Sequence, residues 1–446
     1  MPAPRYKQLL DRLASEIRSG ALRPGTRLPP LRQLARREGL ALVTAGRVYA
    51  ELAAMGLVSG EVGRGTFVRD ASLPPGHGLD LGALAPDLVD LGFNYPTLPG
   101  QAELLRAALR QLAQGGDLEA LLRYQPHGGR AHDRATVARH LASRGLITTG
   151  EQVLLVDGAQ HGLACCALAL LQPGDVVALD ALSYPGFRLL AETLKLELVA
   201  LPAGEQGPDL AALERLCRTR RVRALYTMPT LHNPLGWVMD LAQREALAAL
   251  ARRHELLLIE DAAYAYLVER APPPLAMLAP ERTVYVSGLS KSVAAGLRLG
   301  FVQAPPAWIP RLERAIRAST WSTPGLTTAI GCAWLEDGTV ARLEREKRAD
   351  ARERQRLAAE LLEPLARVGH PGSYFLWLPL GEAVRADRVA AELLQAGIAV
   401  STASPYAGNG AQPQAQAIRL ALGSVARAAL APALREVRRV IEAHSF

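Results

Sequence analysis

The chain has 446 residues, of which 49% are hydrophobic and 21% are charged, a composition typical of folded globular proteins and unlike that of disordered chains. A chain of this length predicts two or more domains. No apolar run approaches the ~18 residues of a membrane span, and the first residues lack the apolar segment of a signal peptide, so we expect a cytoplasmic protein with no membrane partner.

The net charge of +8 is unevenly distributed along the chain. Residues 1–70 hold twelve Lys and Arg against six Asp and Glu, whereas the other 376 residues hold 39 against 37. This asymmetry indicates a basic N-terminal module that binds a polyanion and a nearly neutral body. The cysteines show no metal-site spacing, so we expect reduced thiols and no metal site; they are Cys165, Cys166, Cys217 and Cys332.

The first 70 residues predict three helices followed by a small β-hairpin. Apolar residues at helical spacing precede Gly20, a second helix covers residues 31–38, and a third covers about 43–55. Residues 57–58 and 66–68 predict two strands around a Gly-Arg-Gly turn. These elements have the spacing of a helix-turn-helix with a wing, in which the second helix of the motif enters the major groove of DNA.

Residues on and around this second helix of the motif are the candidate DNA contacts, and most of them are arginines, which can hold both guanine and phosphate. They are Arg32, Thr44, Arg47, Arg64 and Gly65. The alternative is a small helical domain with scattered surface arginines. The segment from LPPLRQL, which begins at Leu28, to GRGTFV resembles the GntR class of winged-helix repressors, which implies binding to double-stranded operator DNA. Ala41 stands where that class commonly has serine.

Residues 71–86 are rich in Pro and Gly without periodicity, which predicts a linker between two domains, residues 1–70 and 87–446. From about residue 130, strand-like runs alternate with helical ones, and this alternation predicts an α/β domain with a mostly parallel sheet of seven strands. The strands are expected at 153–156, 176–179, 196–199, 224–227, 256–259, 284–286 and 299–302. We assign a large lobe to about 120–305 and a smaller α+β lobe, together with the N-terminal arm, to about 306–446, with short strands at 375–378, 398–401 and 418–422.

Residues with chemical potential follow several of these strands. Lys291 comes after one strand, with Arg298 seven residues later, and Asp261 ends another, with Tyr264 three residues further on. A lysine at a strand end is usually a surface charge. A carboxylate at a buried strand end can hold the proton of a pyridinium ring, and an amine can form a Schiff base, so the pair suits pyridoxal phosphate (PLP).

Three further features suit the same cofactor. Gly158 begins a strand-to-helix turn whose free N–H groups favour a phosphate. Asn233 presents an amide on a tight turn, and Tyr184 supplies a ring that can stack on a planar cofactor. Each feature is common alone, but the whole set predicts a PLP site.

The set resembles the fold type I aminotransferases over residues 90–446. The resemblance implies that Lys291 forms the aldimine with PLP, that Asp261 pairs with the pyridine nitrogen, and that Lys291, Asp261 and Tyr264 are the catalytic residues. It implies that Asn233 and Tyr264 hydrogen-bond the phenolic oxygen and that Tyr184 stacks on the ring. Two positions depart from the family pattern, Gly288, where a hydroxyl is common, and Asn94-Tyr-Pro-Thr, where Gly-x-Pro-Asp is common.

The resemblance also implies contacts beyond the ring. Ala159, Gln160, Ser290 and Arg298 would bind the phosphate. Tyr124 would reach the phosphate of the neighbouring subunit, which implies a head-to-tail homodimer. Arg419 would bind the carboxylate of a substrate or effector through two parallel hydrogen bonds.

A GntR-like winged helix fused to an aminotransferase-like domain resembles the MocR-type transcriptional regulators. The resemblance implies a regulator that senses PLP or a small amino compound through an aldimine at Lys291. The alternative is a PLP-dependent aminotransferase with an appended DNA-binding domain, because every residue needed for transamination is present. A third reading, a DNA-binding module beside a PLP-free domain, conflicts with the presence of Lys291, Asp261 and Arg298 together.

Overall fold

The computed structural model describes residues 5–18, 21–23, 25–54, 57–61, 65–68, 88–204, 206–381, 384–407 and 416–444. The predicted linker, residues 71–86, and the predicted wing-tip residue Arg64 lie outside the described residues. Within the described ranges, no helix is long and apolar enough to cross a membrane.

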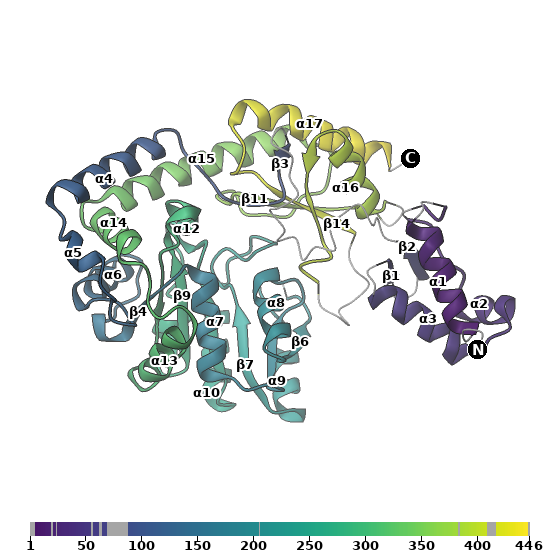
Figure 1. Cartoon of the computed structure of the whole chain (residues 1–446), viewed down its shortest axis with the longest axis horizontal. Helices are drawn as coiled ribbons and strands as arrows, with labels where there is room; N and C mark the ends of the chain where they lie inside the picture. The colour runs from purple at the N-terminus through teal and green to yellow at the C-terminus, as the bar shows by residue number, and fades with distance from the viewer. Residues whose placement is uncertain are drawn as a thin grey trace.

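The N-terminal domain has the predicted winged helix-turn-helix fold and lies at one end of the molecule (Figure 1). Its buried side chains, including Leu34, Val48 and Leu52, form a core of their own. Gly39, with φ of +63°, adopts the left-handed conformation that ends the second helix and turns the chain into the third. The elements are α1 (Arg5–Arg18), α2 (Leu31–Glu38), α3 (Leu42–Ala54), β1 (Val58–Glu61) and β2 (Gly65–Val68).

The large lobe contains the predicted seven-stranded sheet, with strand order β4-β10-β9-β8-β7-β5-β6. Neighbouring strands are parallel except for β10, which is antiparallel to both of its neighbours. The strands are β4 (Val153–Val156), β5 (Val176–Asp180), β6 (Glu197–Leu201), β7 (Val222–Thr227), β8 (Leu257–Asp261), β9 (Thr283–Gly288) and β10 (Gly300–Gln303).

Helices cover both faces of this sheet, which explains why most of its strands are apolar throughout. Val156 and Val286 pack toward α7 and α13, whereas Leu155 and Tyr285 pack toward α6 and α14. Leu258 faces α10 and α11. The helices are α6 (Ala131–Ala142), α7 (Ala159–Leu170), α8 (Pro185–Thr193), α9 (Leu210–Thr219), α10 (Leu241–Arg253), α11 (Leu275–Leu278), α12 (Leu289–Ser292), α13 (Ile309–Ser319) and α14 (Gly325–Glu336).

The small lobe is a three-stranded antiparallel sheet of order β11-β14-β13 with helices packed against it. Its elements are β11 (Phe375–Pro379), β12 (Ile398–Ala399), β13 (Ser401–Thr402), β14 (Ala417–Ala421), α15 (Thr339–Leu361), α16 (Ala386–Gln395) and α17 (Arg427–Ala443). The N-terminal arm contributes β3 (Val89–Asp90), α4 (Gln101–Gly115) and α5 (Leu118–Leu121). Strand β3 pairs with β12, which attaches the arm to the small lobe.

Two details differ from the sequence pattern. The expected strand 398–401 is divided, because β12 pairs with the arm strand β3 while β13 pairs with β14. Helices α13 and α14, which the sequence places in the small lobe, pack on the large lobe, where Ile316 and Trp334 join the apolar clusters on the two faces of the sheet. Both differences arise from partners that are distant in sequence.

Candidate functional site

Strand ends from distant parts of the sequence meet at one edge of the large-lobe sheet. Strands β8 and β9 are parallel, so the carboxyl end of β8 at Asp261 lies beside the β9–α12 connection that carries Lys291. Strand β10 is antiparallel to β4 and β9, so Arg298, which precedes it, returns to the same edge. Open α/β sheets bind ligands beyond the carboxyl ends of their strands, and this edge therefore positions the candidate site.

Asp261 is a buried carboxylate with two hydrogen-bond donors. The Tyr226 hydroxyl donates to its Oδ2 at 2.8 Å, and the Ala263 N–H donates to its Oδ1 at 3.0 Å. Burial raises the pKa of Asp261, and the Tyr226 hydrogen bond opposes that rise. A carboxyl group desolvated in this way gains most from a cationic partner, such as a protonated ring nitrogen.

The Lys291 amine lies in a network formed by the N-terminal arm. Its Nζ donates to the Asn94 carbonyl at 2.5 Å, and Asn94 Nδ2 in turn donates to the Tyr264 hydroxyl at 3.2 Å. Lys291 Nζ also lies 6.0 Å from the centroid of the Tyr264 ring. Two of the predicted residues are thus brought together through Asn94.

Two side chains hydrogen-bond the backbone carbonyl of Lys291. The Tyr266 hydroxyl and the Lys347 ammonium donate to the Lys291 carbonyl at 2.8 and 3.1 Å. Lys347 is fully buried, and its Nζ also donates to the carbonyls of Pro96 and Val293, both at 2.7 Å. Burial and the nearby Lys291 lower the pKa of Lys347 to about 7.

A glycine turn and an arginine form a cradle at the start of α7. Gly158 has φ of +82°, and a Cβ added there would lie 2.6 Å from Arg298 Nη2. Arg298 donates to the Asp157 carbonyl at 2.9 Å and, at 3.4 Å, to the Ser290 hydroxyl. This turn places the N–H groups at the start of α7, which begins at Ala159, beside a guanidinium, and both favour a phosphate.

The neighbouring glycines explain one departure from the family pattern. A Cβ added at Gly288 would lie 2.8 Å from the Leu299 carbonyl oxygen, and one added at Gly300 would lie 2.5 Å from the Gly158 carbonyl carbon. The backbones of three strand ends therefore approach too closely for a hydroxyl-bearing side chain at position 288.

Two buried side-chain oxygens near this edge have unused hydrogen-bonding capacity. Gln160 Nε2 donates to the Gly186 carbonyl at 2.8 Å, but its Oε1 has no partner among the described residues, and neither has Asn233 Oδ1. The Tyr184 ring lies beside Gly186, and burial raises the pKa of its hydroxyl. Buried polar atoms without partners are costly, so these oxygens fit a ligand that hydrogen-bonds to them.

Arg419, on β14, is a buried cation that forms no ion pair with a carboxylate in the described part of the chain. It is 3% exposed, its Nη1 donates to the Gly92 carbonyl at 3.0 Å, and its Nε has no partner there. The guanidinium lies 5.0 Å from the centroid of the Phe375 ring, which also contacts Tyr264 edge to face. A buried guanidinium without a counter-charge is suited to a carboxylate ligand.

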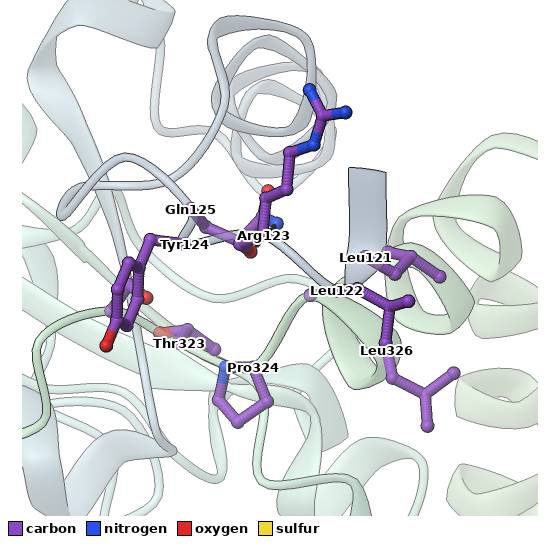
Figure 2. A pocket seen from close by; sticks show the side chains of 10 residues that line it. Leu121, Leu122, Arg123, Tyr124, Gln125, Thr323, Pro324 and Leu326 are labelled. Atoms are coloured by element: carbon purple, nitrogen blue, oxygen red, sulfur yellow. Dashed lines mark hydrogen bonds between the residues drawn. The ribbon is translucent and has the colours of Figure 1, made fainter. Parts of the chain in front are cut away.

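Tyr124 stands apart from these residues within the chain. It is 85% exposed and packs on Trp321, with ring centroids 5.7 Å apart. It lines a cavity of about 490 Å³, and Figure 2 shows Tyr124 at one end of this cavity and Leu122 and Leu326 at the other, with Pro324 between them. Leu122 is 89% exposed, so the cavity has an exposed apolar side chain at this end.

The candidate DNA contacts lie on the surface of the N-terminal domain. Arg32 and Arg47 are exposed, and Thr44 is half-buried. Arg47 donates to Glu51 at 2.8 Å and lies 4.5 Å from the centroid of the Tyr6 ring. Gly65 starts β2 with φ of +120°, a conformation that favours glycine.

Sequence reasoning did not select Asn94, Tyr226 or Lys347 as site residues. Tyr226 shows a faint signal, a polar tip within an apolar strand. For Lys347 the only signal in the sequence is the rarity of lysine, since the chain has only four. Their partners are 35 to 251 residues away, so spacing along the chain could not reveal them.

This fold and the chemistry at its edge define the class of fold type I PLP-dependent proteins. Residues 86–435 match the family aminotransferase class I and II, and residues 5–68 match the bacterial regulatory proteins of the gntR family. The chain belongs to the aminotransferase class I and II family and carries a GntR DNA-binding domain, the combination of MocR-type transcriptional regulators. The aminotransferase fold implies PLP as its cofactor.

Known proteins support this assignment over nearly the whole chain. The HTH-type transcriptional regulator TauR of Rhodobacter capsulatus is 28% identical over 97% of this chain and 96% of its own. The probable rhizopine catabolism regulatory protein MocR of Rhizobium meliloti is 27% identical over 80% of this chain and 77% of its own. The crystal structure of LysN, an alpha-aminoadipate aminotransferase of Thermus thermophilus, covers 81% of this chain and 93% of its own with a TM-score of 0.73 and 27% identity.

Proposed function

We propose that this protein is a cytoplasmic transcriptional regulator that senses PLP, or an amino compound that reacts with it, through an aldimine at Lys291. The observation that carries the proposal is the presence, in one chain, of a GntR domain and of the residues that a PLP site needs. The winged helix would bind double-stranded operator DNA, and the large domain would receive the signal.

Different residues at the sheet edge fit different parts of the PLP ring. Asp261, desolvated and held by Tyr226, would pair with the ring nitrogen. Asn233, whose Oδ1 has no partner among the described residues, would donate from its amide to the phenolic oxygen beside Tyr264. PLP supplies an aldehyde that reacts with amines and a ring that withdraws electrons.

The phosphate would lie in the Gly158 cradle. Ala159 and Gln160 would contribute from the start of α7, and Ser290 and Arg298 from the β9–β10 connection, which the 3.4 Å contact between these two side chains supports. Tyr184 would stack on the ring. Arg298 leaves no room for a side chain at position 158, so its guanidinium lies directly against the backbone of this turn. This close packing supports a fixed anion site.

The effector would carry a carboxylate or a similar anion, because Arg419 is buried and forms no ion pair with a carboxylate among the described residues. Arg419 donates to the Gly92 carbonyl and Lys291 to the Asn94 carbonyl, so arm segment 92–94 accepts hydrogen bonds from both cations. A bound effector would compete with these arm contacts and move the arm. The effector shifts the arm only if the two arm positions differ in affinity for the effector, and DNA binding changes only if these positions also differ in affinity for DNA.

A contact between domains supports the coupling. The Arg385 guanidinium of the small lobe lies 4.2 Å from the centroid of the Phe67 ring in the wing. The arm is attached to the same lobe through β3 and β12. Movement of the arm would therefore reach the wing through the small lobe.

We further propose a head-to-tail homodimer. Tyr124 is too exposed for a residue that serves its own subunit, and its neighbours Leu122 and Leu326 form an apolar surface that a second copy would bury. In such a dimer Tyr124 would contact the phosphate of the partner subunit.

The proposal is tested by titrating the purified protein with PLP and recording both visible absorbance and the anisotropy of labelled DNA from upstream of its own gene. The expected result is a saturable absorbance change and sequence-specific DNA binding. A protein that binds PLP but no DNA would contradict the regulator.

The second candidate is an aminotransferase with an attached DNA-binding domain. The observation that favours it is that Lys291, Asp261 and Arg419 are all present, on a fold similar to that of LysN. Incubation of the PLP-loaded protein with amino acids and an oxoacid separates the two. Repeated formation of a new amino acid supports the enzyme, whereas a stable adduct without turnover supports the sensor.

A further inference from the structure

The first turn of α3 exposes two adjoining aliphatic side chains. Val43 is 85% exposed and Leu42 is 49% exposed. Valine is a poorer helix former than alanine, and exposed aliphatic groups add nothing to folding stability. Folding therefore does not explain these residues, and a binding partner that covers them would.

The rest of α3 shows which way this turn faces. The side chains that fill the domain core are Ala45, Val48, Tyr49 and Leu52. Residues three and four apart lie on one helix face, and the outward face that includes Val43 continues with Gly46, Arg47 and Ala50. A Cβ added at Gly46 would touch nothing within 4 Å, so this face is flat and open beyond Val43.

Exposed arginines lie on both helices of this helix-turn-helix. Arg32 and Arg36 on α2 are exposed, as is Arg47 one turn further along α3. The partner must therefore combine negative charge around its edge with an apolar group at its centre. Duplex DNA has this combination, because phosphates border a major groove whose apolar group is the C5-methyl of thymine.

We infer that Val43, with Leu42 beside it, recognises thymine in the operator through contact with its C5-methyl group. The inference rests on the proposed DNA binding by α3 and adds the base that the helix start selects. Specificity at this position would come from van der Waals contact and the exclusion of water, whereas Arg47 would supply a hydrogen-bonding contact one turn away.

The test uses the full-length protein and a labelled duplex from upstream of its own gene, with the protected region located by footprinting. Each thymine in that region is replaced singly by uracil, which keeps every hydrogen-bonding group and removes only the methyl. We expect at least one position in each half-site where wild-type affinity falls about fourfold, the factor expected for one buried methyl group. At that position Val43→Ala should bind the thymine and uracil duplexes equally.

Ile147→Ala is the matched control, because Ile147 is an aliphatic residue of the body that is 76% exposed. This variant should keep the full loss of affinity on uracil. If wild-type protein binds specifically but tolerates uracil throughout the protected region, or if Val43→Ala and Leu42→Ala keep the loss, the thymine inference is overturned. If no specific binding occurs at all, the proposed regulator fails instead.

Discussion

Lys291 is one of only four lysines in the chain, which makes its proposed role unusually easy to test. Its amine faces Tyr264 and the arm, whereas Lys195 is exposed and Lys347 is enclosed by three carbonyl groups. Lys291→Ala should abolish the PLP that borohydride fixes to the protein, as measured by mass spectrometry. Lys195→Ala should leave it unchanged, and PLP still fixed at full yield in Lys291→Ala would disprove the assignment.

Glu260 predicts a pH dependence of stability. It is buried beside Asp261, its Oε2 accepts the Ala276 N–H at 3.0 Å, and burial raises its pKa to about 7. The folded state thus keeps a proton that the unfolded state releases above pH ~4.5, so stability falls as pH rises from about 4.5 to about 7.

Glu260→Gln keeps the shape and removes this titration. The free energy of unfolding is measured with denaturant at pH 5 and at pH 8. Between these pH values the wild type should lose up to about 3 kcal/mol more of this free energy than the variant does. Equal losses in the two proteins would show that Glu260 is already ionised at pH 5.

The residues of the site differ in how far the sequence reveals them. Lys291 and Gly158 follow strands and Asp261 ends one, so the local pattern predicts where these residues lie. Asn94 contacts Tyr264 and Lys291, which lie 170 or more positions away. Lys347 contacts Pro96, Lys291 and Val293, which lie 54 or more positions away. No local spacing encodes such contacts.

At the scale of elements, α3 carries the DNA-binding prediction. Arg47 is paired with Glu51 in the free protein, but an exposed pair of this kind contributes little and can exchange for DNA. Arg47→Ala should weaken binding to upstream DNA by about 1–3 kcal/mol in an anisotropy titration, with PLP absorbance unchanged. Unaltered DNA affinity would mean that α3 does not read the operator.

The elements themselves follow closely from the sequence. All seven strands of the large-lobe sheet lie where the apolar runs predict them, because both faces of that sheet are covered by helices. The divided strand at residues 398–401 was not predictable, since its first half pairs with β3, more than 300 residues earlier in the chain.

At the scale of the whole molecule, the exposed surface around Tyr124 predicts association. Leu122→Glu would place a charge in the centre of the proposed interface, and burying an unpaired charge is costly. Light scattering should therefore show wild-type dimers and Leu122→Glu monomers at micromolar concentration, with Ile147→Glu, on another exposed surface, still dimeric. Dimers of unchanged strength in Leu122→Glu would place the interface elsewhere.

The central claim is that the PLP site and the DNA-binding domain act on each other. It is tested most directly by the affinity of wild-type and Lys291→Ala protein for upstream DNA, measured by fluorescence anisotropy without PLP, with PLP, and with PLP plus a mixture of amino compounds. We predict that wild-type affinity changes with at least one of these additions and that Lys291→Ala affinity does not. The same DNA affinity for both proteins under all three conditions would contradict a sensor that acts through Lys291.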